Sequence, residues 1–236
     1  MARFTVTNSW SINLMRIAAL TDIHGRLEHI EDAGPMLRQM DVVLLPGDLT
    51  MFGRRKDAEE VVNAVRQYCD RIFAVMGNCD YPEVEAYLEE EGMCLHRKHV
   101  VVDGVAFAGL GGSLPCPIPT LNEWPEETLA GYLEESVAGL PDDTDLVLVS
   151  HQPAKDTAVD LAGNGQHVGS EAVRGFIETH NPLICFSGHI HEADGVDSIG
   201  QCTLVNPGPF MQGRFAVVEI GNGDLSLTLH GPDGSK

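Results

Sequence analysis

The sequence predicts an α/β fold in which a largely parallel β-sheet is covered by helices. Short apolar runs alternate with amphipathic helical patterns through the first half of the chain, which is the order that βαβ units produce. The length of 236 residues allows one or two domains, and no linker, internal repeat or low-complexity tract divides the chain. We therefore expect a polar leader over residues 1–14 and a single domain over residues 15–236.

Three strands and three helices are expected in the first half of this domain. The apolar runs that predict strands are residues 16–20, 42–45 and 72–76. Helical spacing covers residues 27–40, where Pro35 is expected to interrupt the helix. It also covers residues 58–65, where apolar positions recur at i, i+3, i+4 and i+7. Pro82 is typical of a first helical turn and begins a third, acidic helix that ends near residue 91.

The second half begins with a hairpin, because Asp103-Gly104 separates two apolar runs. A long loop rich in Gly and Pro follows over residues 111–127; it could be a lid, a dimer contact or a mobile surface loop. Helices are expected near residues 126–137 and 171–179. Further strands are expected at residues 146–149, 183–186, 202–205, 215–220 and 225–229.

The charge balance excludes several classes of partner. The chain has 35 Asp and Glu against 15 Lys and Arg, which gives a net charge of −20. A protein held on nucleic acid by phosphate contacts needs a basic stripe, and docking on anionic lipid also needs positive charge. The acidity is typical of a solvated surface or of a salt-adapted protein. We therefore expect no nucleic-acid partner and no membrane partner.

Targeting signals and disulfide patterns are both missing from the sequence. No apolar run approaches the roughly 20 residues that span a bilayer, and residues 1–14 lack the apolar stretch of a signal peptide. The six cysteines are scattered without a C-x-x-C pair, which is typical of reduced thiols. These features predict a cytoplasmic protein.

Polar residues with metal-binding side chains follow five of the predicted strands. They lie in the turns at residues 21–24, 47–48, 77–80, 150–151 and 187–191. Ligands of open α/β sheets gather beyond the carboxyl ends of the strands. These turns therefore bring together two carboxylates, one amide and four imidazoles: Asp22, Asp48, Asn78, His24, His151, His189 and His191.

This donor set indicates two divalent transition metal ions. Oxygen and imidazole donors without thiolate suit Mn²⁺, Fe, Zn²⁺, Ni²⁺ or Co²⁺ at a catalytic site. Seven donors are too many for one catalytic ion, whereas they suit two ions about 3.5–4 Å apart with one carboxylate shared. Turn stabilisation and helix capping could explain Asp22 or Asn78 singly. They do not explain Gly188-His189-Ile190-His191 after a buried strand.

The ordered motifs resemble those of the calcineurin-like metallophosphoesterase superfamily. Asp-x-His, Gly-Asp, Gly-Asn-x-Asp, an isolated His and Gly-His-x-His occur in the family order between Asp22 and His191. The stretches GGSLPCPIPT, HVGS and NPGP also resemble the compact stand-alone prokaryotic members. The resemblance implies two packed mixed β-sheets flanked by helices, an α/β/β/α sandwich.

The resemblance also implies roles for the seven donors. It assigns Asp22, His24 and His191 to one metal ion, and Asn78, His151 and His189 to the other. Asp48 would bridge the two ions, with Mn²⁺ the expected metal. The implied reaction is in-line attack on a small phosphate ester by a metal-bridging hydroxide. Asp48, Asn78, Cys79 and His151 are the expected catalytic residues.

Cys79 is a departure from the family pattern. Many members carry His at this position, which is thought to protonate the leaving oxygen, and a thiol is a poorer donor. Some small members that resemble this chain carry Cys and are associated with phosphodiester hydrolysis, so we favour a phosphodiesterase. Cys79 could equally be a semi-apolar filler beside the metals. A phosphomonoesterase or nucleotide pyrophosphatase is the alternative activity, and a non-catalytic metal-binding scaffold is the alternative class.

Three further residues have two interpretations each. Arg26 could bind a substrate phosphate or be a solvated arginine at a helix entry. His167 could reach the substrate or make a local hydrogen bond in its loop. Asp80 could support its turn from behind the ligands, but we favour an N-cap for the helix that begins near Pro82. The expected partner is a small phosphate ester, and the chain could form a homo-oligomer.

Overall fold

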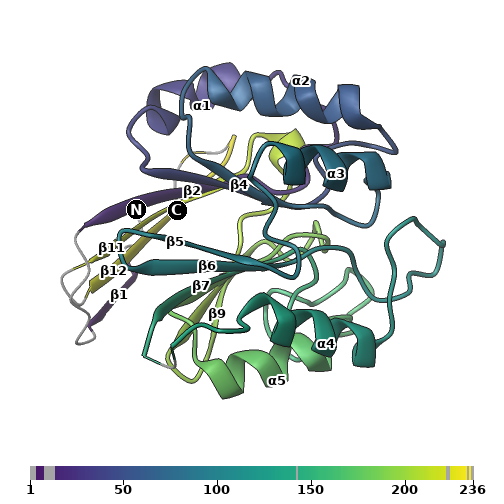
Figure 1. Cartoon of the computed structure of the whole chain (residues 1–236), viewed down its shortest axis with the longest axis vertical. Coiled ribbons are helices and arrows are strands. Elements are labelled where there is room, and N and C mark those ends of the chain that lie inside the picture. The colour runs from purple at the N-terminus through teal and green to yellow at the C-terminus, as the bar shows by residue number, and fades with distance from the viewer. Residues whose placement is uncertain (1–3, 8–13, 142, 222–223, 233, 235–236) are drawn as a thin grey trace.

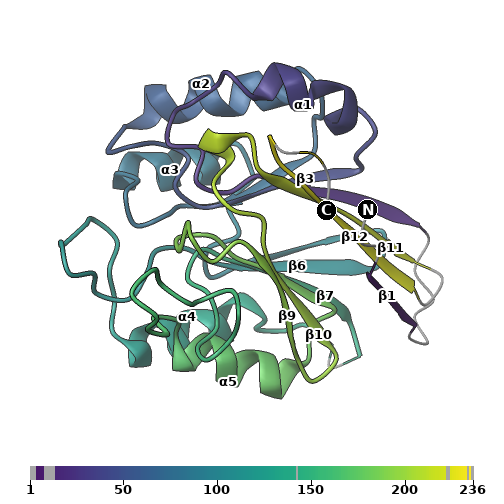
Figure 2. The ribbon, with the colours of Figure 1, turned by 180° about the vertical axis from the view of Figure 1, so that it is seen from behind.

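Two six-stranded β-sheets pack against each other, and helices cover both outer faces (Figures 1 and 2). The computed structural model describes residues 4–7, 14–141, 143–221, 224–232 and 234. Three helices lie over one sheet and two over the other, which confirms the predicted α/β/β/α arrangement. In the part of the chain that the structure describes, no helix is both long and apolar enough to cross a membrane.

The first sheet contains the amino-terminal parallel strands. Its order is β1-β12-β11-β2-β3-β4, and β2, β3 and β4 run parallel while the other neighbours are antiparallel. The register pairs Ala18 with Val43 and Leu44 with Phe73. The strands are β1 (Phe4–Thr7), β2 (Met15–Ala19), β3 (Val42–Pro46), β4 (Ile72–Val75), β11 (Phe215–Gly221) and β12 (Asp224–His230).

The second sheet has four parallel strands between two antiparallel edges. Its order is β5-β6-β7-β8-β10-β9, and β6, β7, β8 and β10 run parallel. The strands are β5 (His99–Val102), β6 (Val105–Leu110), β7 (Asp145–Ser150), β8 (Ile184–Phe186), β9 (Gly195–Ile199) and β10 (Cys202–Asn206). Five of the parallel strands, β2, β3, β4, β7 and β8, end in the turns that carry the candidate ligands.

Five α-helices and one short 3₁₀ helix complete the described fold. Those beside the first sheet are α1 (Ile30–Leu37), α2 (Arg55–Arg66) and α3 (Pro82–Glu90). Those beside the second sheet are α4 (Glu126–Ser136) and α5 (Glu171–His180), and the 3₁₀ helix is η1 (Phe210–Gln212). Pro35 lies inside α1 and does not interrupt it. The proline removes only the hydrogen bond to the carbonyl of Glu31, and Glu31 is exposed to water.

The apolar residues form three layers of core. In β2, Ile17 and Ala19 face the core between the two sheets, whereas Ala18 faces the core under α1 and α2. This alternation explains why the strand is apolar throughout, because both of its faces are buried. A third core separates the second sheet from α4 and α5. All six cysteines lie in the described part of the chain, and all are free thiols.

Two strands were missed by the sequence analysis. Residues 4–7, within the expected leader, form β1 and pair antiparallel with β12; residues 1–3 and 8–13 lie outside the described part. The second missed strand is β9, an edge strand in which only Ile199 is buried. Short edge strands need few apolar residues, so the apolar pattern that identifies central strands does not detect them.

Candidate metal centre

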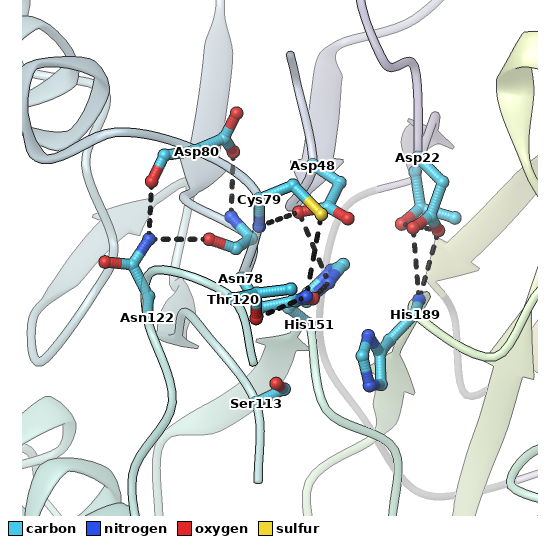
Figure 3. Close-up of polar contacts among 12 residues, drawn as sticks. Asp22, Asp48, Asn78, Cys79, Asp80, Ser113, Thr120, Asn122, His151 and His189 are labelled. Atoms are coloured by element: carbon cyan, nitrogen blue, oxygen red, sulfur yellow. Dashed lines mark hydrogen bonds and ion pairs between the residues drawn. The ribbon is translucent and has the colours of Figure 1, made fainter. Parts of the chain in front are cut away.

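The seven candidate ligands converge where the parallel strands of both sheets end. They come from the turns after β2, β3, β4, β7 and β8. Asp22, His24, Asp48, Asn78 and His151 are buried, while His189 and His191 are at the boundary of the buried region. Figure 3 shows Asp48 between Asp22 and the turn that carries Asn78 and Cys79. The predicted convergence is therefore present in the structure.

Asp22, His24 and His191 form the first cluster. His191 Nε2 lies 3.2 Å from Asp22 Oδ1 and 3.3 Å from His24 Nε2. His24 Nε2 is 3.9 Å from the same carboxylate oxygen. These three potential ligand atoms lie close enough together to coordinate one cation. Although burial opposes its ionisation, hydrogen bonding to His191 and the nearby imidazoles hold the pKa of Asp22 below its usual value.

His151 and Asn78 form the second cluster, and a cation would suit their contact. His151 Nδ1 donates to the Pro46 carbonyl at 2.8 Å, so the Nε2 of the neutral ring carries a lone pair. That nitrogen lies 2.9 Å from Asn78 Oδ1. Asn78 Nδ2 donates to Thr120 Oγ1 at 3.0 Å, which places the carbonyl end of the amide toward His151. Two acceptors therefore face each other, and a metal ion would satisfy both.

Asp48 lies between the two clusters. Its Oδ2 is 3.8 Å from His24 Nε2, and its Oδ1 is 3.6 Å from His151 Nε2. The backbone N–H of Cys79 donates to Oδ1 at 2.9 Å and holds the carboxylate in this orientation. Burial raises the pKa of Asp48 to about 7, because the protein supplies too little positive charge to offset desolvation. Each oxygen faces one cluster, as a bridging carboxylate requires.

His189 joins the two clusters through its backbone and its ring. Its backbone N–H donates to Asp22 Oδ2 at 3.1 Å, and its ring centroid is 5.1 Å from that of His151. Desolvation by burial lowers the pKa of His189 to about 3, so the ring is neutral at pH 7, the form that can ligate a metal. Its Nε2 also lies 3.7 Å from the Sγ of Cys116, a residue that the sequence analysis did not single out.

The turns that carry the ligands are strained and tightly packed. Asp22, His24, Asp48 and His189 all have φ between 49° and 67°, a region that costs non-glycine residues about 1–3 kcal/mol each. Glycine is also required in the Asn78 turn, because a Cβ on Gly77 would lie 2.0 Å from Asp48 Oδ1. Strain of this kind clusters at functional sites, where the surrounding structure holds it in place.

Asp80 does not cap α3, so the favoured interpretation of this residue is wrong. Tyr81 is the N-cap residue, and no side chain caps the helix. The Asp80 carboxylate is fully buried and accepts hydrogen bonds from the backbone N–H groups of Leu49, Thr50 and Gly77 and from the Thr50 hydroxyl, at 2.7–3.1 Å. These donors belong to the turns after β3 and β4. Asp80 therefore fastens the Asp48 turn to the Asn78 turn.

One end of loop 111–127 is built into the wall of the site. Asn122 Nδ2 donates to the carbonyls of Gly77 and Asp80 at 2.8 and 2.7 Å (Figure 3). Thr120 Oγ1 accepts from Asn78 and donates to Glu123 Oε1 at 2.6 Å. The Thr120 N–H donates to the same carboxylate oxygen. Because the Glu123 carboxylate only accepts, the Thr120 hydroxyl donates to it and accepts from the Asn78 amide. This network orients the Asn78 amide, and no sequence motif identified it.

The two predicted substrate residues make local contacts. Arg26 is exposed, and its guanidinium lies 3.7 Å from the Glu28 carboxylate. His167 Nδ1 lies 2.6 Å from the buried carboxylate of Asp160, which fits the loop hydrogen bond that was the alternative interpretation. Neither contact involves a candidate ligand. Cys79 is buried, and burial together with the charge of Asp48 raises the pKa of its thiol.

Comparisons with known proteins agree with this geometry. Residues 15–193 match the family described as calcineurin-like phosphoesterase. The chain belongs to this family. It is 34% identical over 206 residues to the uncharacterized protein MJ1162 of Methanocaldococcus jannaschii, over 84% of this chain and 90% of that protein.

Solved structures share the fold of this phosphoesterase. The crystal structure of TT1561 of Thermus thermophilus has a TM-score of 0.72 at 20% identity, over 91% of this chain and 98% of that one. A predicted phosphoesterase from Streptococcus pneumoniae has a TM-score of 0.51 at 14% identity, over 96% of this chain and 98% of that one. Family membership and the buried His and Asp groups together support candidate metal sites in this phosphoesterase.

Replacing Thr120 with Val should weaken binding of one metal ion by about 10–100-fold, because the Asn78 amide then loses the partner that orients it. Thr120→Ser keeps the hydroxyl and should bind metal like the wild type. Isothermal titration with Mn²⁺ measures both variants. Equal affinity and stoichiometry in Thr120→Val and the wild type would contradict the role assigned to this network.

Replacing Asp80 with Asn should lower the free energy of unfolding by about 2–4 kcal/mol, because an amide group would face backbone N–H donors. Asp32→Asn is the matched control, since the Asp32 side chain is 84% exposed and should change stability by about 0.5 kcal/mol or less. Urea unfolding of the two variants measures the difference. A stability loss no greater than that of the control would show that Asp80 does not fasten the two turns.

Proposed function

We propose that this phosphoesterase is a phosphodiesterase that uses two divalent metal ions to hydrolyse small phosphate esters. The observation that carries the proposal is the placement of Asp48 between two clusters of competent ligands, with the Cys79 thiol beside it. All seven candidate positions carry side chains that can bind a metal. A scaffold that had lost its catalytic function would not need this complete set.

The described residues suit two metal positions. Asp22, His24 and His191 would hold one ion, and Asn78, His151 and His189 would hold the other, with Asp48 shared. Bound ions would supply an activated water and the positive charge that neutralises a phosphate group. The chain's own part is to orient the imidazoles, as the hydrogen bond from His151 to the Pro46 carbonyl does.

Cys79 favours diesters over monoesters. The thiol lies in a buried position beside Asp48, where its raised pKa keeps the proton on sulfur. A protonated thiol of raised pKa is a weak general acid, whereas the histidine found here in many relatives is a stronger one. A substrate whose leaving group needs no proton, such as an aryl ester, is least affected by this difference.

The surface charge favours a small substrate. Residues 99–154 contain nine Asp or Glu and no Lys or Arg, within a chain of net charge −20. Such a surface repels polyphosphate chains and nucleic acids at long range. A small ester carries little charge and can be captured at short range by the metal centre.

With Mn²⁺ present, bis(p-nitrophenyl) phosphate should give a higher kcat/KM than p-nitrophenyl phosphate. Cys79→His should raise kcat/KM for an alkyl monoester such as glycerol 2-phosphate by about 10-fold or more, because its alkoxide leaving group needs the proton that a general acid supplies; Cys79→Ser is the control and should not. Parallel assays with Fe²⁺, Zn²⁺, Ni²⁺ and Co²⁺ identify the preferred metal.

Faster turnover of the monoester by the wild type, or of a nucleotide pyrophosphate, would replace the diesterase proposal with the alternative activity on the same site. Hydrolysis of none of these compounds with any of the metals would favour the binding scaffold. A gain in monoester turnover by Cys79→Ser equal to that of Cys79→His would show that proton donation is not the reason for the preference.

A further inference from the structure

Exposed apolar side chains gather on the loops that border the metal centre. The described part of the chain has eight large apolar residues that are exposed. Two of them, Leu14 and Val101, lie away from these loops, just before β2 and on β5. The other six lie on segments that follow or contact the ligand turns: Met51, Phe52, Ile118, Leu121, Leu161 and Val168. We call these six residues the apolar rim.

Backbone hydrogen bonds tie the first part of the rim to the ligand turn after β4. The N–H of Phe52 donates to the carbonyl of Cys79 at 3.2 Å, and the N–H of Leu121 donates to the carbonyl of Asn78 at 2.9 Å. Ile118 lies three residues before Leu121 in the same loop and is 81% exposed. Two loops that are far apart in the sequence therefore present apolar side chains beside one ligand turn.

The second part of the rim is tied to the ligand turns after β7 and β8. The carbonyl of Val168 accepts from the buried side chain of Gln152, the residue after a candidate ligand, at 3.0 Å. In the same loop, the N–H of Gly163 donates to Glu192, which follows another candidate ligand, at 2.8 Å. Leu161 lies two residues before Gly163. The rim therefore borders the centre on the sides of both sheets.

Phe52 gives a second, independent reason to assign a role to this surface. Its φ is 52°, in the left-handed region that costs a non-glycine residue about 1–2 kcal/mol. Bulky residues are rare there. The side chain is nevertheless 48% exposed, so full burial in the core does not offset the strain. An exposed aromatic ring on a strained turn next to a ligand turn indicates a binding role.

We propose that the apolar rim binds the organic group of the phosphodiester substrate, an alkyl or aryl group without charge. This inference rests on the proposed function, because it takes the phosphate to lie at the candidate ligands. The ester groups of such a substrate must extend from the buried ligands toward solvent, and the rim is the apolar surface beside them. A second copy of the chain is disfavoured as the occupant, because each copy carries a net charge of −20.

A series of p-nitrophenyl alkyl phosphates tests this proposal, because the leaving group stays constant while the other ester group grows from methyl to butyl to octyl. The concentrations are kept below micelle formation. The wild type should show kcat/KM rising by about 2-fold per added methylene group between methyl and butyl, since each buried methylene adds hydrophobic transfer energy. The methyl ester carries the same p-nitrophenyl group as the longer esters and is the reference against which the added methylene groups are compared.

Three variants locate the effect. Ile118→Ser and Phe52→Asn should each lower the ratio of octyl to methyl kcat/KM by about 3-fold or more. Val101→Ser removes an exposed apolar side chain on β5, away from the rim, and should leave the ratio unchanged. Asn tolerates a positive φ better than Phe, so Phe52→Asn should also fold at least as well as the wild type.

The outcomes separate the two proposals. Turnover of the methyl ester with no dependence on chain length overturns the rim proposal and leaves the phosphodiesterase standing. No turnover of any ester with any divalent metal overturns the phosphodiesterase. A dimer that dissociates on Ile118→Ser, with an unchanged octyl to methyl ratio, shows that the rim is covered by a second copy and also overturns the proposal.

Discussion

The position of Asp48 between two groups of candidate ligands is the constraint on which the rest of the site depends. Its two oxygens face His24 on one side and His151 on the other, and burial raises the pKa of its carboxyl group to about 7. Packing two sheets with the carboxyl ends of their parallel strands at one edge makes this convergence geometrically available. The strained turns, the glycine at residue 77 and the Asp80 hydrogen bonds then hold the carboxylate where two cations could share it.

The sequence predicted the parts of this arrangement that have strong local signals. Buried parallel strands are apolar on both faces, and five of them (β2, β3, β4, β7 and β8) end in short turns with metal-binding side chains, so fold class and ligand convergence could be inferred together. Edge strands such as β1 and β9 carry no such signal. Asp80 was predicted to cap the helix that begins near Pro82, because capping is judged from neighbouring residues in the sequence. Its four donors instead come from the turns after β3 and β4.

The supporting residues could not be predicted because they act across long sequence separations. Thr120 and Glu123 orient Asn78 from a loop more than forty residues away in the chain. A loop of Gly, Pro and polar residues has no periodicity, so its contacts depend on the whole fold. The exposed apolar side chains of the same loop became informative only when the structure placed them beside the ligand turns. The proposed substrate specificity therefore depends on loops that the strand pattern does not describe.

The most direct test of the central claim is the number of transition metal ions bound per chain, measured by titration with Mn²⁺ and by metal analysis of the loaded protein. The account predicts two ions in the wild type and a loss of at least one in Asp48→Asn, with the fold retained by circular dichroism. A wild-type protein that binds no transition metal would contradict the account. So would an Asp48→Asn variant that binds two ions with wild-type affinity.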